Sequence, residues 1–156
     1  MKKIFHLLIV TFVFFFAACD DTTETIIPTL EVNPINLNGT WQLAEWRNAP
    51  LADSTYVYII LNRKDLSFRI YDNMASMYPS LTSGTFELEN DYKLGDIISG
   101  IYDYEQGSWN HSYIVTDLNE ESMIWTATDD ATDVQKFVRV ASVPTHIMES
   151  AREIVE

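Results

Sequence analysis

Eight short segments with the character of β-strands follow one another between Asn38 and Ala141, and this series most strongly limits what the chain can fold into. In most of them apolar or β-branched side chains alternate with polar ones, which is the period of a half-buried strand. Turn-forming residues separate the segments, and no strand–helix–strand pattern occurs among them. We therefore expect an all-β domain, either an antiparallel barrel or a sandwich. The expected strands are residues 39–47, 55–61, 67–72, 84–88, 92–104, 109–117, 122–128 and 134–140.

After Pro144 the apolar residues change to the period of a helix, with charged residues off the apolar stripe. The stripe consists of Ile147, Met148, Ala151, Ile154 and Val155. Because a helix this short is marginal in isolation, we expect it to pack its stripe on the outside of the β-domain. The alternative is a frayed tail.

The first 18 residues have the organisation of a secretory signal peptide. Met1–Lys3 is basic, and Ile4–Ala18 is an apolar run that is too short for the roughly 20 residues of a spanning helix. The run ends in Phe16–Ala17–Ala18–Cys19, which resembles the lipobox of bacterial lipoproteins. The resemblance implies cleavage before Cys19 and lipidation of its thiol, with palmitate as a typical acyl group. The alternative is an ordinary signal peptide followed by a chance cysteine.

The sequence after Cys19 predicts a linker and the cellular location of the protein. Asp20–Glu24 resembles the acidic surface-export signal of Bacteroidota lipoproteins. That resemblance implies a lipid-anchored protein of the bacterial outer membrane, exposed at the cell surface. Two other interpretations stay open: retention at the inner membrane and a merely solvated linker. We expect residues 19–36 to be a flexible acidic linker, although its apolar residues could lie against the domain, which we place at residues 37–156.

Charge and cysteine content narrow the classes of partner. The formal net charge is −13, and loss of Lys2 and Lys3 with the leader makes it −15, because the leader contains no Asp or Glu. So acidic a protein repels nucleic acid, and we expect no nucleic-acid partner. Cys19 is the only cysteine, so no disulfide forms within one chain. We expect a monomer without a metal or cofactor.

Three short motifs in the β-domain resemble those of the lipocalins. Gly39–Thr40–Trp41 is similar to their G-x-W motif, and Thr116–Asp117–Leu118 resembles their T-D-Y turn with Leu in place of Tyr. Arg139 lies where lipocalins carry an arginine that packs over the tryptophan. The resemblance implies an eight-stranded antiparallel up-and-down barrel followed by a short helix. Gly39, Trp41 and Arg139 are then the structural residues that close one end of the barrel.

Aromatic residues are unusually frequent on the expected strands, and they have two interpretations. Most are needed as core, since each aromatic side chain buries 150–250 Å². Some could instead line a cavity for a small hydrophobic or amphipathic ligand, the function that the resemblance implies. The candidate ligand-binding residues are Tyr56, Tyr58, Phe68, Phe86, Trp109, His111, Tyr113 and Trp125. The loop of residues 73–79 would then be either a lid over the mouth or packing on the rim.

A second functional class is a non-enzymatic surface module that recognises a glycan or a protein through exposed aromatic residues. Its platform would consist of Trp46, Tyr71, Tyr104 and Trp109. A hydrolase would need two carboxylates that converge in a cleft, and no catalytic motif is present, so we expect no enzyme. The three aspartates of residues 129–133 lack the order of a calcium loop, and we expect a solvated turn there.

We expect metabolic labelling with palmitate to mark the protein through Cys19. Cys19→Ala should abolish the labelling and move the protein from the membrane fraction to the soluble fraction, because acyl chains contribute ~0.8 kcal/mol per buried methylene to membrane binding. Thr22→Ala, three residues away in the linker, should leave both unchanged. Undiminished labelling of Cys19→Ala would contradict the assignment.

Overall fold

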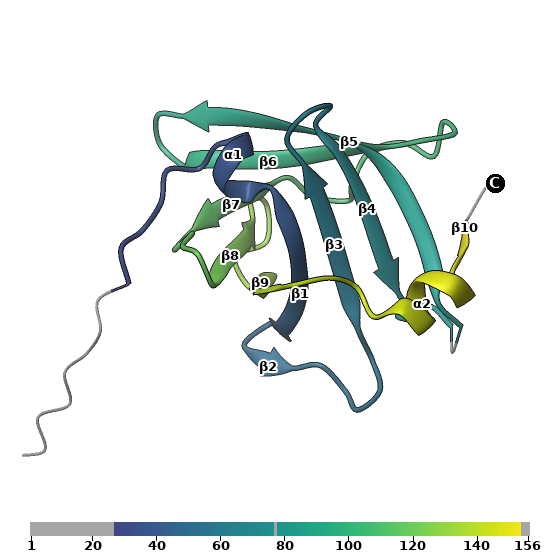
Figure 1. Ribbon diagram of the computed structural model, residues 1–156. Coiled ribbons are helices and arrows are strands. Elements are labelled where there is room, and N and C mark those ends of the chain that lie inside the picture. Colours follow the sequence, from purple (N-terminus) through teal and green to yellow (C-terminus); the bar gives the residue numbers. More distant parts are fainter. Residues whose placement is uncertain (1–26, 77, 154–156) are drawn as a thin grey trace, which may run out of the picture.

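Eight antiparallel strands close into a barrel in the computed structural model, which describes residues 27–76 and 78–153 (Figure 1). The barrel strands are β1 (Gly39–Trp46), β3 (Val57–Asn62), β4 (Ser67–Asp72), β5 (Ser80–Asp91), β6 (Gly95–Tyr102), β7 (Tyr113–Thr116), β8 (Ser122–Ala127) and β9 (Val134–Val140). The remaining elements of these residues are short: β2 (Ala49–Pro50), β10 (Arg152–Glu153), α1 (Pro34–Leu37) and α2 (Thr145–Ser150).

The strand order follows the chain. Each barrel strand pairs antiparallel with the next barrel strand, β5 with β6 included, and β9 returns to pair with β1. The register places Trp41 opposite Arg139. This circuit confirms the predicted eight-stranded up-and-down barrel with a short helix after the last strand. Closure also leaves no long free edge that could pair with another chain.

Strand β5 is longer than the sequence predicted, because it serves two neighbours in succession. Its first half pairs with β4 and its second half with β6, and the exchange takes place at Gly84. A Cβ atom at Gly84 would collide with the carbonyl of Ile101 and with the ring of Phe68. Glycine therefore allows the close approach at the point where the sheet folds over. Residues 80–83 contain a single apolar side chain, Leu81, and so show no alternation, which is why only 84–88 was expected.

One end of the barrel is plugged from inside by the turn of chain that precedes β1. Asn33 caps α1, because its Oδ1 accepts hydrogen bonds from the N–H groups of Ile35 and Asn36, each at 3.0 Å. Leu37 and Trp41 have no exposed surface. The indole N–H of Trp41 donates a hydrogen bond to the carbonyl of Leu37 at 2.9 Å. The large ring is thus both packed and satisfied at the closed end.

Arg139 lies over the plug and joins three segments of the chain. Its Cζ is 4.0 Å from the centroid of the Trp41 ring, which is the stacking that the resemblance implied. Its guanidinium donates hydrogen bonds, each of 2.8 Å, to the carbonyls of Asn36, Asn38 and Glu120. Gly39 has a φ of 143°, and a Cβ there would lie 2.5 Å from Nη1 of Arg139. These contacts give Gly39, Trp41 and Arg139 their closing positions.

The folded unit begins before residue 37. The backbone N–H of Leu30 donates a hydrogen bond to the carbonyl of Leu118 at 2.7 Å. Leu30 and Val32 pack against the core. The end of the expected linker therefore lies against the barrel, as the alternative interpretation had it, and a flexible assignment up to residue 36 is wrong for these residues.

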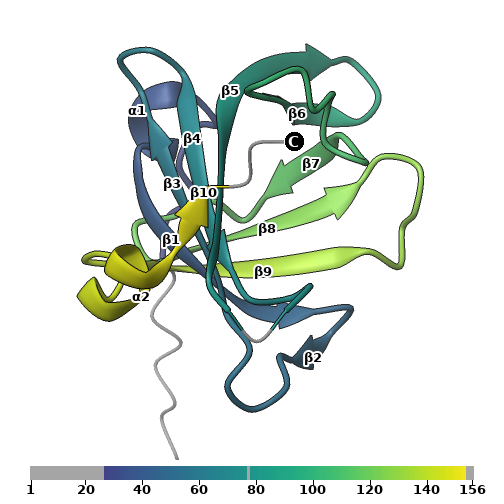
Figure 2. The same cartoon turned by 90° about the vertical axis from the view of Figure 1, so that its right-hand side faces the viewer.

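The C-terminal helix packs on the outside of the barrel, as predicted, but it is shorter than expected. Figure 2 shows α2 and β10 beside the outer side of β4 and β5. Ile147 joins a buried outer cluster whose other members are Tyr58, Tyr71 and Val143. The helix ends at Ser150, and Arg152–Glu153 then pairs in parallel with Ser80 and Leu81. The free β5 edge beside residues 80–83 offers backbone partners, so the chain becomes extended.

Residues 1–26 lie outside the described part of the chain, and so do the expected leader, Cys19 and the acidic residues after it. Ile154 and Val155, the last members of the predicted helical stripe, also lie outside it. Neither helix in residues 27–153 has the length and apolarity that crossing a membrane requires.

We expect Arg139→Lys to lower the free energy of unfolding by about 1–3 kcal/mol, because a lysine cannot reach three carbonyls in a fixed fork while covering the Trp41 ring. Arg69→Lys is the matched control, since Arg69 is exposed on β4. Urea denaturation followed by tryptophan fluorescence measures both. Equal stability of the two variants would show that the closed end does not depend on this guanidinium.

Candidate ligand-binding site

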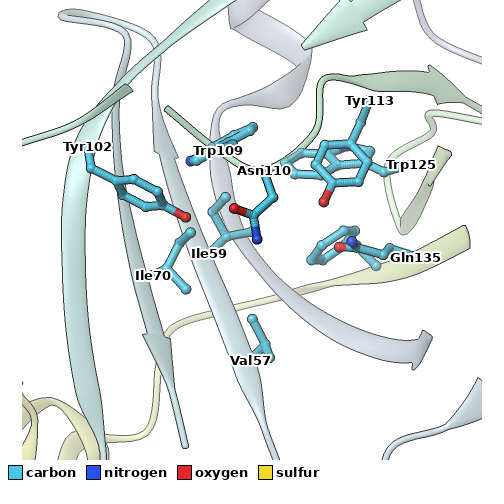
Figure 3. Close-up of a pocket in the computed structure, with 10 residues that line it drawn as sticks. Val57, Ile59, Ile70, Tyr102, Trp109, Asn110, Tyr113, Trp125 and Gln135 are labelled. Carbon is cyan, nitrogen blue, oxygen red and sulfur yellow. The ribbon is translucent and has the colours of Figure 1, made fainter. Parts of the chain in front are cut away.

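A cavity of about 140 Å³ lies inside the barrel above the packed core, toward the end opposite the plug (Figure 3). Strands β3, β4, β6, β7, β8 and β9 contribute to its wall, together with the loop before β7. The lining residues are Val57, Ile59, Ile70, Tyr102, Trp109, Asn110, Tyr113, Trp125, Gln135 and Phe137. The wall is therefore mainly apolar and aromatic with two amide side chains, the usual composition of a site for a small molecule.

Stacked and tilted rings form one side of the cavity. The centroid of the Trp109 ring lies 5.6 Å from that of Trp125, and Trp125 lies 5.6 Å from Tyr113 and 4.8 Å from Phe137. Trp109 also lies against the backbone of Gly100, where a Cβ atom would overlap its indole. Each ring is thus held between others, so the wall is preformed.

Two hydrogen-bond donors in this wall lack acceptors. The indole N–H groups of Trp109 and Trp125 are buried, and neither has a partner within the described residues. A buried donor without an acceptor costs about 1–3 kcal/mol. Such donors are rare in a packed core.

The cavity adjoins a wider hollow of about 430 Å³ at the open end, which we call the mouth. The two volumes share Val57, Tyr102, Asn110, Tyr113 and Gln135 as lining residues. The mouth alone adds Leu43, Trp46, Arg47, Asp72, Met74, His111 and Asp133. An occupant can therefore enter from the open end and extend from an apolar interior to a polar rim.

Two aspartates, Asp72 and Asp133, line the mouth, and two others, Asp129 and Asp130, are each bonded to a residue that lines it. Asp129 lies 2.6 Å from Nδ1 of His111, and Asp130 lies 3.3 Å from Nη2 of Arg47. Asp133 is only 4% exposed and accepts a hydrogen bond of 2.6 Å from the indole N–H of Trp46. The expectation of a solvated turn at residues 129–133 is thus wrong for Asp133, which the β9 register turns inward beside Trp46.

Burial changes the ionisation of the two tyrosines that face this rim. Burial raises the pKa of Tyr113 to about 12, and the nearby carboxylate of Asp133 adds to the effect, while a hydrogen bond with Gln135 opposes it. Burial, assisted by Asp72, also raises the pKa of Tyr102 above its ordinary value. Both phenols are therefore neutral at physiological pH and can donate a hydrogen bond.

The structure brings together half of the residues expected from sequence. Trp109, Tyr113 and Trp125 line the cavity, and His111 lines the mouth. Phe68 and Phe86 are fully buried in the packed core, with the Phe68 ring 5.0 Å from that of Trp109. The latter two support the wall without lining it.

Tyr56 and Tyr58 lie outside the barrel, so their assignment to a ligand site in its interior is wrong. On β3 the inward positions belong to Val57 and Ile59, and the alternation of a strand turns Tyr58 outward. Tyr58 is buried by Ile147, a residue of α2, with Tyr56 packed beside it. Both rings were expected inside because nothing local reveals that α2 covers this strand.

The lining residues that sequence reasoning missed are Val57, Ile59, Ile70, Tyr102, Asn110, Gln135 and Phe137. The two-residue alternation of β9 could have identified two of these residues from the sequence. Arg139 reaches the Trp41 ring, so Phe137 and Gln135, two and four residues earlier, share its inward face. Asn110 lies in the loop before β7, where no period applies.

The four aromatic residues expected to form an exposed platform for a glycan or a protein do not come together on the surface. Tyr71 is 6% exposed in the outer cluster, and Trp109 lies in the cavity wall. Trp46 is half-buried and hydrogen-bonded to Asp133. Tyr104 is 54% exposed. Within the described residues no group of three or more His, Cys, Asp or Glu side chains could hold a metal ion.

A small up-and-down barrel with one plugged end and a hollow at the other is the class that this geometry defines. The model of the lipocalin-like domain family matches residues 37–125, from the end of α1 through most of β8. These are 89 of the 156 residues, and the chain belongs to this family. No curated protein and no solved structure matched the chain.

The raised pKa of Tyr113 predicts a loss of stability at alkaline pH. A folded-state pKa of about 12 exceeds the ordinary value of about 10, so the contribution is complete below pH ~10 and is lost as pH rises toward 12. We expect Tyr113→Phe to flatten this fall in the free energy of unfolding, measured by urea denaturation across that range. Tyr92→Phe, at a ring 86% exposed, should leave the profile unchanged. Identical profiles for both variants would contradict the assignment.

Proposed function

We propose that the protein binds one small hydrophobic or amphipathic molecule in the open half of its barrel. The observation that supports this most directly is the aromatic cavity of about 140 Å³ that adjoins the mouth of about 430 Å³. An eight-stranded barrel has room either for packed side chains or for one small ligand. Here packing fills the plugged end, and the other end is hollow.

The volume limits the size of the buried part of the ligand. A cavity of ~150 Å³ lined by apolar side chains is known to hold one benzene ring. The inner cavity has nearly that volume, so it suits one aromatic ring or a short aliphatic group. A long acyl chain would not be enclosed. The remainder of a ligand would occupy the mouth between Asp72 and Asp133.

We propose binding rather than catalysis. Asp72 and Asp133 both line the mouth, but both accept hydrogen bonds, from Met74 and Ser80 in one case and from Trp46 in the other. These hydrogen bonds engage both carboxyl groups within the protein, whereas an acid–base pair acts on the atoms of a substrate. None of the residues that line the inner cavity is a Ser, Thr, Cys, Lys, His, Asp or Glu.

We further propose that this binding takes place at the bacterial cell envelope, with Cys19 lipidated and the protein at the outer membrane, facing outward. The lipobox-like sequence and the acidic residues after it support this proposal. The chain enters the folded unit at the plugged end, where Leu30 bonds to Leu118. An anchor upstream of Leu30 would therefore leave the mouth at the end away from the attachment.

Filling the cavity tests the proposed function. We expect toluene, a neutral probe of one ring, to shift the indole N–H signals of Trp109 and Trp125 in nitrogen-15 NMR spectra. Ile70→Phe adds a ring to the cavity wall and should weaken the binding at least about tenfold, or ~1.4 kcal/mol. Ile101→Phe is the matched control, because Ile101 is 52% exposed on β6.

Two results would count against the proposed site. Toluene that leaves both indole signals unchanged would mean that the cavity takes no occupant of this size. Equal affinity of Ile70→Phe and Ile101→Phe would place the bound ring somewhere else on the protein.

A further inference from the structure

The mouth contains two carboxylates without a cationic partner. Asp133 is 4% exposed and Asp72 is half-buried, and neither forms an ion pair within the described residues. Their neighbours Asp129 and Asp130 are paired, with His111 and Arg47. Because a buried charge is costly unless it is paired, both carboxylates would stabilise a cation in the mouth.

Each unpaired carboxylate lines the mouth together with a tyrosine. Asp133 and burial together raise the pKa of Tyr113, and Asp72 contributes in the same way at Tyr102. Both rings line the mouth and the inner cavity alike. Carboxylates and neutral aromatic rings both attract a positive charge. The mouth is lined by both kinds of group from two sides, by β4 and β6 on one side and by β7 and the residue before β9 on the other.

The inner cavity supplies a second, independent indication of an occupant. Trp125 is 3% exposed, lines the cavity and has an indole N–H without a partner. An occupant of the cavity would lie against this ring. The cavity thus suits an apolar body, and the mouth suits a positive charge.

We propose that the occupant is a small organic cation, a protonated amine or a quaternary ammonium attached to one aromatic or short aliphatic group. Its apolar part lies among Ile59, Trp109 and Trp125, and its cationic head lies between Asp72 and Asp133. This inference rests on the proposed function and adds the chemical class of the ligand. The two aspartates would also discriminate between ligands with the same apolar part, because they would attract a cationic head and repel a carboxylate head.

Asp133 also has a structural role, because its Oδ1 accepts the indole N–H of Trp46 and a longer bond from Gln135. That role needs only an acceptor oxygen, and the amide of an asparagine supplies one in the same place. Asp133→Asn therefore keeps the acceptor and removes the charge. A purely structural aspartate would leave ligand selectivity unchanged in this variant.

Three probes that share one phenyl group but differ in charge test the proposal: 2-phenylethylammonium, 2-phenylethanol and phenylacetate. The full chain in phosphatidylcholine nanodiscs is titrated with each by calorimetry, with empty nanodiscs subtracted, and the indole N–H signals of Trp109 and Trp125 are followed by NMR. We expect the cation to bind at least about tenfold more tightly than the alcohol. Phenylacetate should bind more weakly than the alcohol.

Charge-removing variants locate the effect. Asp133→Asn and Asp72→Asn should each weaken binding of 2-phenylethylammonium about five- to tenfold and leave 2-phenylethanol unchanged. Glu87→Gln is the matched control, since Glu87 is exposed on β5 outside the barrel. If Asp133→Asn does not fold, as judged by the Trp41 indole signal, the Asp72→Asn variant decides the question.

The outcomes distinguish a failure of this inference from a failure of the proposed function on which it rests. Equal affinity for the three probes, or a preference for phenylacetate, overturns the cationic ligand while the cavity remains a binding site. Selectivity for the cation that survives both charge-removing variants also overturns it, because the charge would then act elsewhere. If none of the probes binds and toluene does not bind either, both proposals fail.

Discussion

The contact between the Arg139 guanidinium and the Trp41 ring is the interaction on which the rest of the structure depends. It joins the last barrel strand to the first, in the register that pairs these two residues, and so closes the sheet on itself. Its three hydrogen bonds also hold the segment around α1 over the end of the barrel. With Leu37 and Trp41 filling that end, an interior space can exist only at the other one.

The opposite end combines rigid walls with unsatisfied groups. Gly100 lets the indole of Trp109 lie against the β6 backbone, and the neighbouring rings hold it there. Protein cores are normally packed without voids larger than a water molecule, and their polar atoms are paired. A cavity bordered by two orphan indole N–H groups departs from both rules. Such departures are expected where a protein keeps space and donors for something else.

Charge gives the mouth a selectivity that the family's fold does not specify. The chain as a whole is acidic, with a formal net charge of −13. Asp72 and Asp133 differ from exposed carboxylates because they line the mouth and are half-buried and buried, and a charge there is screened less than at the surface. The same barrel with neutral residues at these two positions would discriminate only by size and apolarity.

The sequence by itself indicated the eight strands, because the two-residue period and the turn residues are local properties that need no knowledge of neighbours. The up-and-down order and the closing pair Trp41 and Arg139 were implied by the resemblance to lipocalin motifs. The sequence also indicated Trp109, Tyr113 and Trp125 as candidate ligand-binding residues. Only the tertiary structure decided which face of β3 is covered from outside. The chain after β9 passes over that face and buries Tyr58 beneath Ile147, so an aromatic residue expected in the cavity became part of an outer core.

The tertiary structure likewise decided the burial of Asp133, whose partner Trp46 is 87 residues away in the sequence. It also decided the end of α2, where the free edge of β5 offered backbone hydrogen bonds that a helix could not use. Period and composition describe what each segment can bury. Which other segment buries it depends on long-range contacts that exist only after the barrel has closed.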